Sequence, residues 1–249
     1  MNWIKSLFRK QPDEPYGLSD IGVDMHSHLI PGIDDGSQSI EETLGMLVRF
    51  ESLGYKHLIT TPHVMQDQYK NTSSIILEGL EKVREAIRTH QLSITIDAAA
   101  EYYCDEFFID KIQNDELLTF GNHYVLFEFS FSAKPRLINE AIFALKNKGY
   151  QPVLAHFERY AFYLENGQKA VEDLKNRGVF IQMNLNSLTG HYGKAIRNQA
   201  RMLVDNGYVD FVGSDCHRME HLDILESNLR DPYFHQLKDL KLLNRLLQQ

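Results

Sequence analysis

Long hydrophobic runs, paired cysteines and an excess of positive charge are all missing from this sequence. No apolar run approaches the roughly 18 residues of a membrane-spanning helix, so we expect no transmembrane segment. Two cysteines, Cys104 and Cys216, are too few for a disulfide framework and suit a reducing cytoplasm. A net charge of −8 argues against a nucleic-acid partner, because phosphate binding needs clustered Lys and Arg. We therefore expect a globular, cytoplasmic protein that binds no nucleic acid.

Several catalytic and nucleotide-binding signatures are missing as well. A thiol-based phosphatase needs the pattern Cys-x5-Arg, but Asp110 and Leu222 stand where an arginine would follow Cys104 and Cys216. Neither the dinucleotide-binding pattern G-x-G-x-x-G nor a P-loop occurs. The thiol-based class of phosphatase is therefore excluded.

The N-terminal stretch "MNWIKSLFRK" combines apolar and basic side chains. Its apolar part is too short for a signal peptide, and it has no small-residue cleavage site. Hydrophobic side chains at helical spacing allow two interpretations of residues 2–10. Either this end packs locally, or it makes weak peripheral contact with an anionic membrane. We assign residues 1–20 to an N-terminal extension and residues 21–249 to one domain.

Strand-like and helix-like stretches alternate along that domain. The predicted strands cover residues 21–25, 57–61, 92–100, 123–129, 151–156, 179–184 and 209–214. The predicted helices cover residues 39–54, 73–90, 135–149, 167–177, 193–206 and 232–248. Short apolar strands that alternate with helices are typical of parallel βα units. Seven such units without a linker predict one closed or nearly closed α/β barrel, with an open doubly wound sheet as the alternative.

Histidines and carboxylates stand where nearly every predicted strand ends. They are His26, His28, Asp34 and Asp35 after the first strand, His63 after the second, Glu101, Glu128 and His156 at the third to fifth, and Asp215 and His217 after the seventh. In an α/β barrel these strand ends open on one face, where active sites lie. Imidazoles and carboxylates without thiolates suit Zn, Mn or Fe, and bridging carboxylates suit a multinuclear site. The histidines at strand starts or on helices are interpreted as structural or surface residues: His57, His90, His123 and His235.

Seven motifs carry a family resemblance, in order from residue 24 to residue 217. They are "DMHSH", "DDG", "TPH", "AAAEYY", "LFEFS", "PVLAHFERY" and "SDCH". By these motifs the chain resembles the polymerase-and-histidinol-phosphatase (PHP) superfamily. Within it, the chain resembles the bacterial manganese-dependent protein-tyrosine phosphatases of capsule and exopolysaccharide operons. The resemblance implies a single-domain, distorted TIM-like (β/α)7 barrel with a metal site at the C-terminal ends of the strands.

The resemblance also implies the metals and their ligands. It implies three divalent transition-metal ions, Mn²⁺ first, with Fe or Zn as alternatives. One ion would take His26, His28, Glu101 and Asp215, a second would take Glu101, Glu128 and His156, and the third would take Asp35, His63 and His217. A hydroxide that bridges two ions would be the nucleophile.

Two arginines are implied in substrate binding. Arg159, from "HFERY", matches the phosphate-binding arginine of the family, and it is a catalytic candidate together with Asp215 and His217. The family often has a second arginine in a Gly-Arg context after the last histidine. Here the stretch reads "HRMEHLD", so Arg218 is the candidate for that substrate-binding role.

The substrate implied by the resemblance is a phosphotyrosine protein, specifically the tail of a bacterial tyrosine autokinase that controls capsule or exopolysaccharide synthesis. The segment "EYYCDEFF" is expected at the open face, where its aromatic side chains either meet the phenol ring or belong to the core: Tyr102, Tyr103, Phe107 and Phe108.

Three alternatives remain open from the sequence. The first is a PHP-type phosphatase of small esters such as histidinol phosphate. The second is a metal-dependent amidohydrolase, which often uses a carbamylated lysine after strand four, whereas no lysine follows Glu128 here until Lys134. The third is a metal-bound interaction module without catalysis, which has no need of so many ligands around one pocket.

Overall fold

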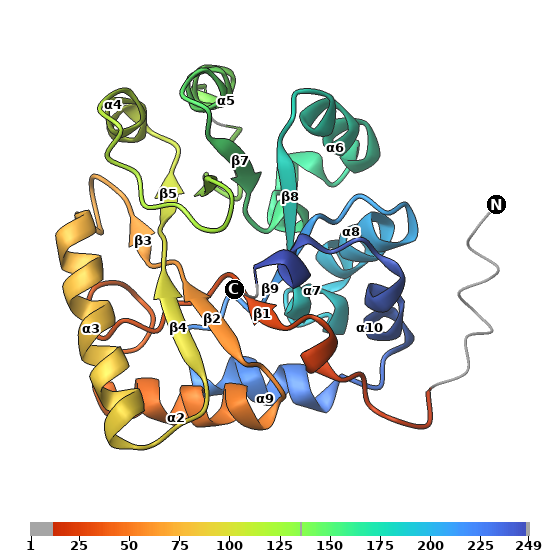
Figure 1. Cartoon of the computed structure of the whole chain (residues 1–249). Coiled ribbons are helices and arrows are strands. Elements are labelled where there is room, and N and C mark those ends of the chain that lie inside the picture. The colour runs from red at the N-terminus through yellow and green to blue at the C-terminus, as the bar shows by residue number, and fades with distance from the viewer. Residues whose placement is uncertain (1–11, 135, 248–249) are drawn as a thin grey trace.

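The strands of the molecule lie in its centre and the helices surround them (Figure 1). The computed structural model describes residues 12–134 and 136–247, so the interpretation of residues 2–10 concerns a segment outside the described residues. The helices are α2 (Ile40–Ser52), α3 (Ser73–Thr89), α4 (Glu106–Gln113), α5 (Ile138–Asn147), α6 (Gly167–Asn176), α7 (Leu185–Thr189), α8 (Lys194–Asp205), α9 (Met219–Ser227) and α10 (Pro232–Gln236). Short 3-10 turns η1 to η5 cover Leu18–Asp20, Phe157–Arg159, Ala161–Tyr163, Leu237–Asp239 and Leu243–Leu246.

Two sheets contain the strands. The three-stranded sheet has the order β1 (Val23–Asp24), β2 (His57–Thr60) and β4 (Thr95–Ala98). The six-stranded sheet has the order β3 (His63–Val64), β5 (Glu101–Tyr103), β6 (Tyr124–Glu128), β7 (Gln151–Leu154), β8 (Phe180–Asn184) and β9 (Phe211–Gly213). Neighbouring strands are parallel in every case, which confirms the predicted α/β class with a parallel sheet.

The second and third predicted strands are each interrupted. β2 stops before Pro62, which has no backbone N–H to give to a neighbouring strand, and the chain resumes as β3. Pairing continues across the break, because the Glu101 N–H donates to Pro62 O at 3.1 Å. The prediction that Glu101 ends the third strand is therefore wrong, because Glu101 opens β5.

Together the two sheets form one curled parallel layer, in which the segments after β1 and β9 meet. The segment after β1 pairs with the segment after β9 through a parallel bridge between Ser27 and Cys216. The Asp215 N–H donates to His26 O at 2.8 Å, and the His28 N–H donates to Cys216 O at 2.9 Å. The residues after β1 and after β9 therefore lie side by side at one end of the sheet.

Helix α2 begins close to where its sequence predicts. The Ser39 hydroxyl accepts a hydrogen bond from the Glu42 N–H, as in a capping box. The Glu42 carboxylate, however, accepts from the N–H of Gln38 and not from that of Ser39. Gly54 takes a positive φ of 100° just past the helix, a conformation that favours glycine.

The predicted helix over residues 232–248 is wrong. The chain forms α10 and then two 3-10 turns, because Asn244 is buried and bound to two strands. Its amide group donates to Val23 O at 2.9 Å and to Val212 O at 2.7 Å, and its oxygen accepts from the Val212 N–H at 3.0 Å. These bonds hold the C-terminal segment against β1 and β9. Helices α4, α7 and α9 were not predicted.

Side chains alternate between two hydrophobic cores along the strands. On β6, Leu126 points inside the curled sheet, whereas Val125 and Phe127 pack outward under the helices. The inner core is formed by Val23, Met25, Ile59, Ala99, Phe120, Leu126, Val153, Ala155, Phe211 and Leu247.

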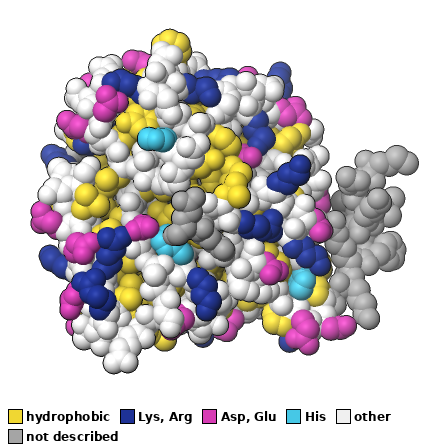
Figure 2. Space-filling view, in the orientation of Figure 1, with side chains coloured by type: hydrophobic (Ala, Val, Ile, Leu, Met, Phe, Trp, Pro, Cys, Tyr) yellow, Lys and Arg dark blue, Asp and Glu magenta, His cyan; other side chains and the backbone are white. Residues whose placement is uncertain are grey.

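On the outer surface, side chains of both charge signs are interspersed, with hydrophobic side chains toward the middle of the visible face (Figure 2). Within the described residues, we find no helix long and apolar enough to cross a membrane.

Candidate metal centre

Unusual backbone conformations aim two of the predicted ligands. His156, just after β7, has a φ of 32°, and Asp215, just after β9, has a φ of 52°. Such left-handed conformations are strained for residues other than glycine and cluster at functional sites. Gly213 leaves room for another predicted ligand, His26, since a Cβ atom at position 213 would lie 2.6 Å from the Cβ of that histidine.

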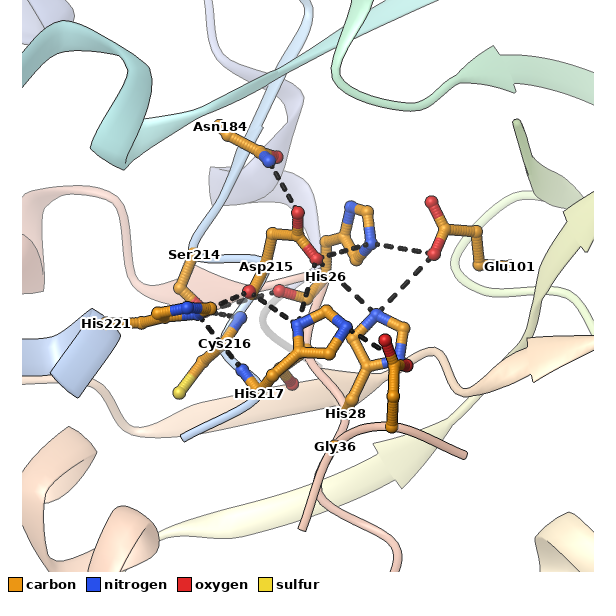
Figure 3. A network of polar contacts seen from close by, with 12 residues as sticks. His26, His28, Gly36, Glu101, Asn184, Ser214, Asp215, Cys216, His217 and His221 are labelled. Carbon is orange, nitrogen blue, oxygen red and sulfur yellow. Dashed lines mark hydrogen bonds and ion pairs between the residues drawn. The ribbon is translucent and has the colours of Figure 1, made fainter. Parts of the chain in front are cut away.

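Glu101 lies at the middle of the cluster of histidines. Its Oε2 atom lies 3.2 Å from His26 Nε2, 3.5 Å from His28 Nε2 and 3.1 Å from His63 Nδ1. Its Oε1 atom lies 3.0 Å from His156 Nε2. Figure 3 shows the rings of His26 and His28 turned toward this carboxylate. One buried carboxylate therefore touches four imidazoles from three separate parts of the chain.

Glu128 and Asp35 extend the cluster on two sides. Glu128 lies 3.0 Å from His63 Nδ1 and 3.5 Å from His156 Nε2. Asp35 Oδ1 lies 3.5 Å from His63 Nε2 and 3.5 Å from His217 Nε2. All nine predicted ligand residues therefore come together at one end of the curled sheet.

The candidate ligand atoms form three groups whose members lie within 4.8 Å of one another. These groups are His28, Asp35, His63 and His217; His26, His28 and Glu101; and His63, Glu101 and Glu128. The first contains the whole predicted third set with His28 added. The second group contains three of the four residues of the predicted first set. The fourth residue of that set, Asp215, lies 3.5 Å from both His26 and His28. The third pairs Glu101 with Glu128, as predicted, but includes His63 instead of His156.

Several buried atoms of the cluster have no hydrogen-bond partner. They are His26 Nε2, His28 Nε2, His63 Nδ1, His156 Nδ1 and Glu101 Oε2. A buried polar atom without a partner costs roughly 1–3 kcal/mol, so a concentration of such atoms calls for an explanation. Imidazole nitrogens and carboxylate oxygens are suitable ligands for divalent transition metals. The residues present therefore fit a metal centre.

Opposite charges inside the centre shift its pKa values strongly. Burial alone would raise the pKa of Glu101, but the imidazoles of His26 and His63 hold it well below its usual range. Burial lowers the pKa of His63, but Glu101 and Glu128 raise it overall to about 10. At neutral pH the Glu101 carboxylate is therefore ionised, and the protonated ring of His63 balances part of its charge.

Arg159 follows His156 on the turn η2 and reaches back into the centre. Its Nη1 donates to Asp215 Oδ2 at 2.9 Å. Its guanidinium carbon lies 4.2 Å from the ring centroid of Phe131 and 4.4 Å from that of Tyr192. Flanking aromatic rings attract a cation and hold the guanidinium plane.

Arg218 is different from Arg159. Its side chain is 68% exposed, and its nearest carboxylate, Glu220, lies 3.8 Å away. Arg218 therefore stands at the outer rim of the site, exposed to solvent.

A cavity of about 870 Å³ opens above the centre. Its lining includes most of the predicted ligands and both arginines, together with residues that sequence reasoning missed: Tyr69, Phe131, His191, Tyr192 and His221. His191 and Tyr192 form the pair "HY" between Gly190 and Gly193. This pair follows the one predicted strand whose end carries no histidine or carboxylate, and that position was the only sequence signal for these two residues.

The aromatic segment around Glu101 divides between surface and core. Tyr103 lines the cavity, as expected. Tyr102 and Phe108 are only 2% and 1% exposed, because they stack on each other in the outer core. Phe107 is partly buried against that core. Of the two alternatives left open by the sequence, the cavity surface therefore applies to Tyr103, and the core applies to Tyr102 and Phe108.

Asp34 lies just behind the predicted ligands and orients two of them. Its Oδ2 atom accepts hydrogen bonds from His28 Nδ1 at 2.8 Å and from the His63 N–H at 3.1 Å. Its other oxygen accepts from the Gly36 N–H at 3.0 Å. Outer carboxylates of this kind fix the ring orientation of a metal-binding histidine.

A curled parallel α/β sheet with a histidine–carboxylate cluster at the carboxyl ends of its strands is typical of metal-dependent hydrolases. The chain belongs to the CpsB/CapC family of capsular polysaccharide synthesis, whose model matches residues 22–224. The family resemblance stated from the sequence motifs is thereby confirmed.

Relatives with names are similar over most of the chain. The tyrosine-protein phosphatase CpsB of Streptococcus pneumoniae is 29% identical over 224 residues, which cover 88% of each chain. The tyrosine-protein phosphatase YwqE of Bacillus subtilis (strain 168) is 27% identical over 199 residues, which cover 80% of this chain and 78% of the relative.

Solved structures agree with this assignment. Crystal structures of YwqE from Bacillus subtilis and CpsB from Streptococcus pneumoniae, described as unique metal-dependent tyrosine phosphatases, include a chain that matches with a TM-score of 0.77. That chain is 25% identical, and the match covers 90% of this chain and 93% of that one. A histidinol phosphate phosphatase from Lactococcus lactis matches with a TM-score of 0.51 at 11% identity, over 85% of this chain and 93% of its own, which shows a shared fold alone.

Proposed function

We propose that this protein is a metal-dependent protein-tyrosine phosphatase. The observation that carries the proposal is the convergence of buried imidazole and carboxylate atoms without hydrogen-bond partners beneath a cavity lined by Arg159. Membership of the CpsB/CapC family and the names of its relatives support the same reaction. The reaction is the hydrolysis of a phosphate monoester.

The metal complement that we propose is three divalent transition-metal ions, with Mn²⁺ first and Fe or Zn as alternatives. Their ligands would be His26, His28, Asp35, His63, Glu101, Glu128, His156, Asp215 and His217, divided as the family resemblance implies. Bound there, such ions activate water for attack and neutralise charge on the phosphoryl group. We also propose that residues 21–249 form one distorted (β/α)7 barrel and that residues 1–20 are an extension of it.

Arg159 would bind the phosphoryl oxygens. A guanidinium offers several N–H groups in a rigid plane. In Arg159, Nη1 donates one hydrogen bond to Asp215. The remaining N–H groups can donate to phosphate oxygens, where paired, charge-assisted bonds are strong. Contacts with the rings of Phe131 and Tyr192 restrict the orientation of this plane. Arg218, at the rim, would add a second contact to the substrate.

Asp215 and His217 complete the proposed catalytic group. His217 Nδ1 lies 3.0 Å from the backbone oxygen of Asp215, a contact that orients the ring toward Asp35. Asp215 joins the histidine pair to Arg159, so the phosphate-binding group and the metal ligands are held in one fixed arrangement. A phenol leaving group, with a pKa of about 10, needs less protonation than an alkoxide would.

The substrate that we propose is phosphotyrosine on a protein, specifically the tail of a bacterial tyrosine autokinase reached from the cytoplasm. Tyr103, Phe131 and Tyr192 supply aromatic surface around the cavity against which a phenol ring can pack. Phosphoserine and phosphothreonine have no ring for that surface.

The test compares rates on phosphotyrosine, phosphoserine and phosphothreonine peptides of matched sequence, with histidinol phosphate as a small ester. We expect hydrolysis of the phosphotyrosine peptide to be fastest by at least an order of magnitude. Comparable rates on all three peptides would mean that the cavity does not read the ring, and the tyrosine-specific assignment would fail.

A further inference from the structure

Strand β8 carries two buried polar side chains but none of the nine proposed ligands. Gln182 and Asn184 are both fully buried and, two residues apart, lie on the same face of the strand. That face is turned toward the centre, where both side chains contact ligand residues. Buried amides are costly unless their hydrogen bonds are made, so the partners of these two residues define their role.

Gln182 contacts the centre on two sides. Its Oε1 atom accepts a hydrogen bond from the His156 N–H at 2.7 Å and lies 3.1 Å from His26 Nδ1. Its Nε2 atom donates to Asn184 Oδ1 at 2.9 Å. Asn184 Nδ2 in turn donates to Asp215 Oδ2 at 2.7 Å, a contact drawn in Figure 3. The chain of bonds therefore connects proposed ligands after β1, β7 and β9.

The direction of this chain is fixed from both ends. At one end the backbone N–H of His156 can only donate, so the oxygen of Gln182 must face it. At the other end the ionised carboxylate of Asp215 can only accept, so Asn184 must turn its NH₂ group toward it. The bond between the two amides then has the one orientation that satisfies both ends.

This direction determines the proton position on His26. Because Gln182 Oε1 is an acceptor, His26 Nδ1 must carry the hydrogen. In the neutral ring, the lone pair then lies on Nε2. His26 Nε2 is one of the buried atoms without a hydrogen bond, and it faces Glu101 Oε2 at 3.2 Å and Asp215 Oδ1 at 3.5 Å.

We infer that Gln182 and Asn184 are positioning residues of the metal centre. Gln182 selects the tautomer of His26 that offers Nε2 to a metal and anchors the backbone of His156. Asn184 holds Asp215 in the orientation that also meets Arg159. This inference rests on the proposed metal-dependent function, and it assigns to β8 a role in building the centre without a ligand of its own.

Gly213 supports this arrangement from the neighbouring strand. A Cβ atom at that position would lie 2.6 Å from the Cβ of His26 and 3.1 Å from Gln182 Nε2. Only glycine at position 213 therefore leaves room for the imidazole of His26 and the amide of Gln182 to meet.

The first experiment replaces Gln182 by leucine, which keeps the approximate size and removes the acceptor. The affinity of the metal-stripped full chain for Mn²⁺ is measured by competition with a chelating dye. We expect Gln182→Leu to lose roughly 10- to 100-fold in metal affinity, the usual effect of removing a partner of a metal-binding histidine. The matched control is Met183→Leu, a buried change on the opposite face of the same strand, which should keep the affinity of the unmodified protein.

A second readout separates positioning from general support of the fold. In the metal-free protein at pH 8, long-range ¹H–¹⁵N correlation spectra report which ring nitrogen of His26 is protonated. We expect the Nδ1–H form in the unmodified protein and in Gln182→Glu, which retains an acceptor, and a mixture of forms in Gln182→Leu. A purely structural role would lower the melting temperature of Gln182→Leu without changing the tautomer of His26.

Unchanged metal affinity in Gln182→Leu, together with an unchanged His26 tautomer, would overturn the inference. If Gln182→Leu does not fold, Asn184→Asp decides the matter for the second residue: it cannot donate to Asp215, so metal affinity must fall, and unchanged affinity would again overturn the inference. Failure of the unmodified chain itself to bind any divalent metal would instead reject the proposed function.

Discussion

Two roles are possible for Arg159, a structural ion pair and a phosphate ligand. Its bond to Asp215 alone would make it a structural ion pair, whereas its position on the cavity wall between two aromatic rings suits a phosphate ligand. We expect Arg159→Ala to lower turnover of phosphate esters by roughly one to three orders of magnitude, comparable to the loss of one transition-state contact. Steady-state kinetics measure this, and metal content should stay unchanged. The control is Arg177→Ala, which changes an arginine at the C-terminal end of helix α6. Equal activity of the Arg159 and Arg177 variants would leave Arg159 with the ion-pair role only.

Cys104 provides a second test at the scale of one residue. It is buried in the outer core, and burial raises the pKa of its thiol to about 12. A protonated, buried thiol is a poor nucleophile, so Cys104 should resist alkylation. Removal of this thiol should not affect catalysis. We expect the Cys104→Ala protein to keep its activity and the unmodified protein to survive iodoacetamide at pH 8. Rapid inactivation by the reagent would point to a thiol-dependent reaction.

Among the elements, the C-terminal segment depends most on a single side chain. Asn244 satisfies three backbone groups of β1 and β9, so its loss leaves buried donors and acceptors without partners. We expect Asn244→Ala to lower the free energy of unfolding by about 2–4 kcal/mol. Urea denaturation measures the change. Asn206→Ala, which removes one exposed bond to Met202 O, should change it by less than about 0.5 kcal/mol; a similar small effect for Asn244 would show that the segment is not held by these bonds.

The elements also show what local sequence can and cannot predict. Helix α2 was predictable because Ser39, the apolar face and Gly54 are all local signals. The C-terminal helix was mispredicted because the bonds of Asn244 reach residues more than 30 and more than 200 positions away along the chain. The ligand candidates were predictable because each lies at or soon after the end of a predicted strand. Gln182 and Tyr192 were missed because their function depends on which strands become neighbours.

At the scale of the whole molecule, metal binding should be coupled to stability. The centre joins segments that are far apart in the chain, and its unpartnered buried atoms cost free energy that a cation would recover. A ligand that binds only the folded chain stabilises it by about 2.7 kcal/mol at 100 times its Kd. We therefore expect the melting temperature to fall on treatment with a chelator and to recover on addition of Mn²⁺. An identical melting temperature with and without chelator would argue against a metal centre that bridges these segments.

In our proposal, the histidine–carboxylate centre makes the molecule a metal-dependent tyrosine phosphatase. The most direct test is the rate of hydrolysis of a phosphotyrosine peptide, measured against the number of metal ions bound per chain by elemental analysis. We predict no turnover in the stripped protein, and full turnover once about three Mn²⁺ ions per chain have returned, since activated water and charge neutralisation both require them. Full turnover by a protein free of metal would contradict the account.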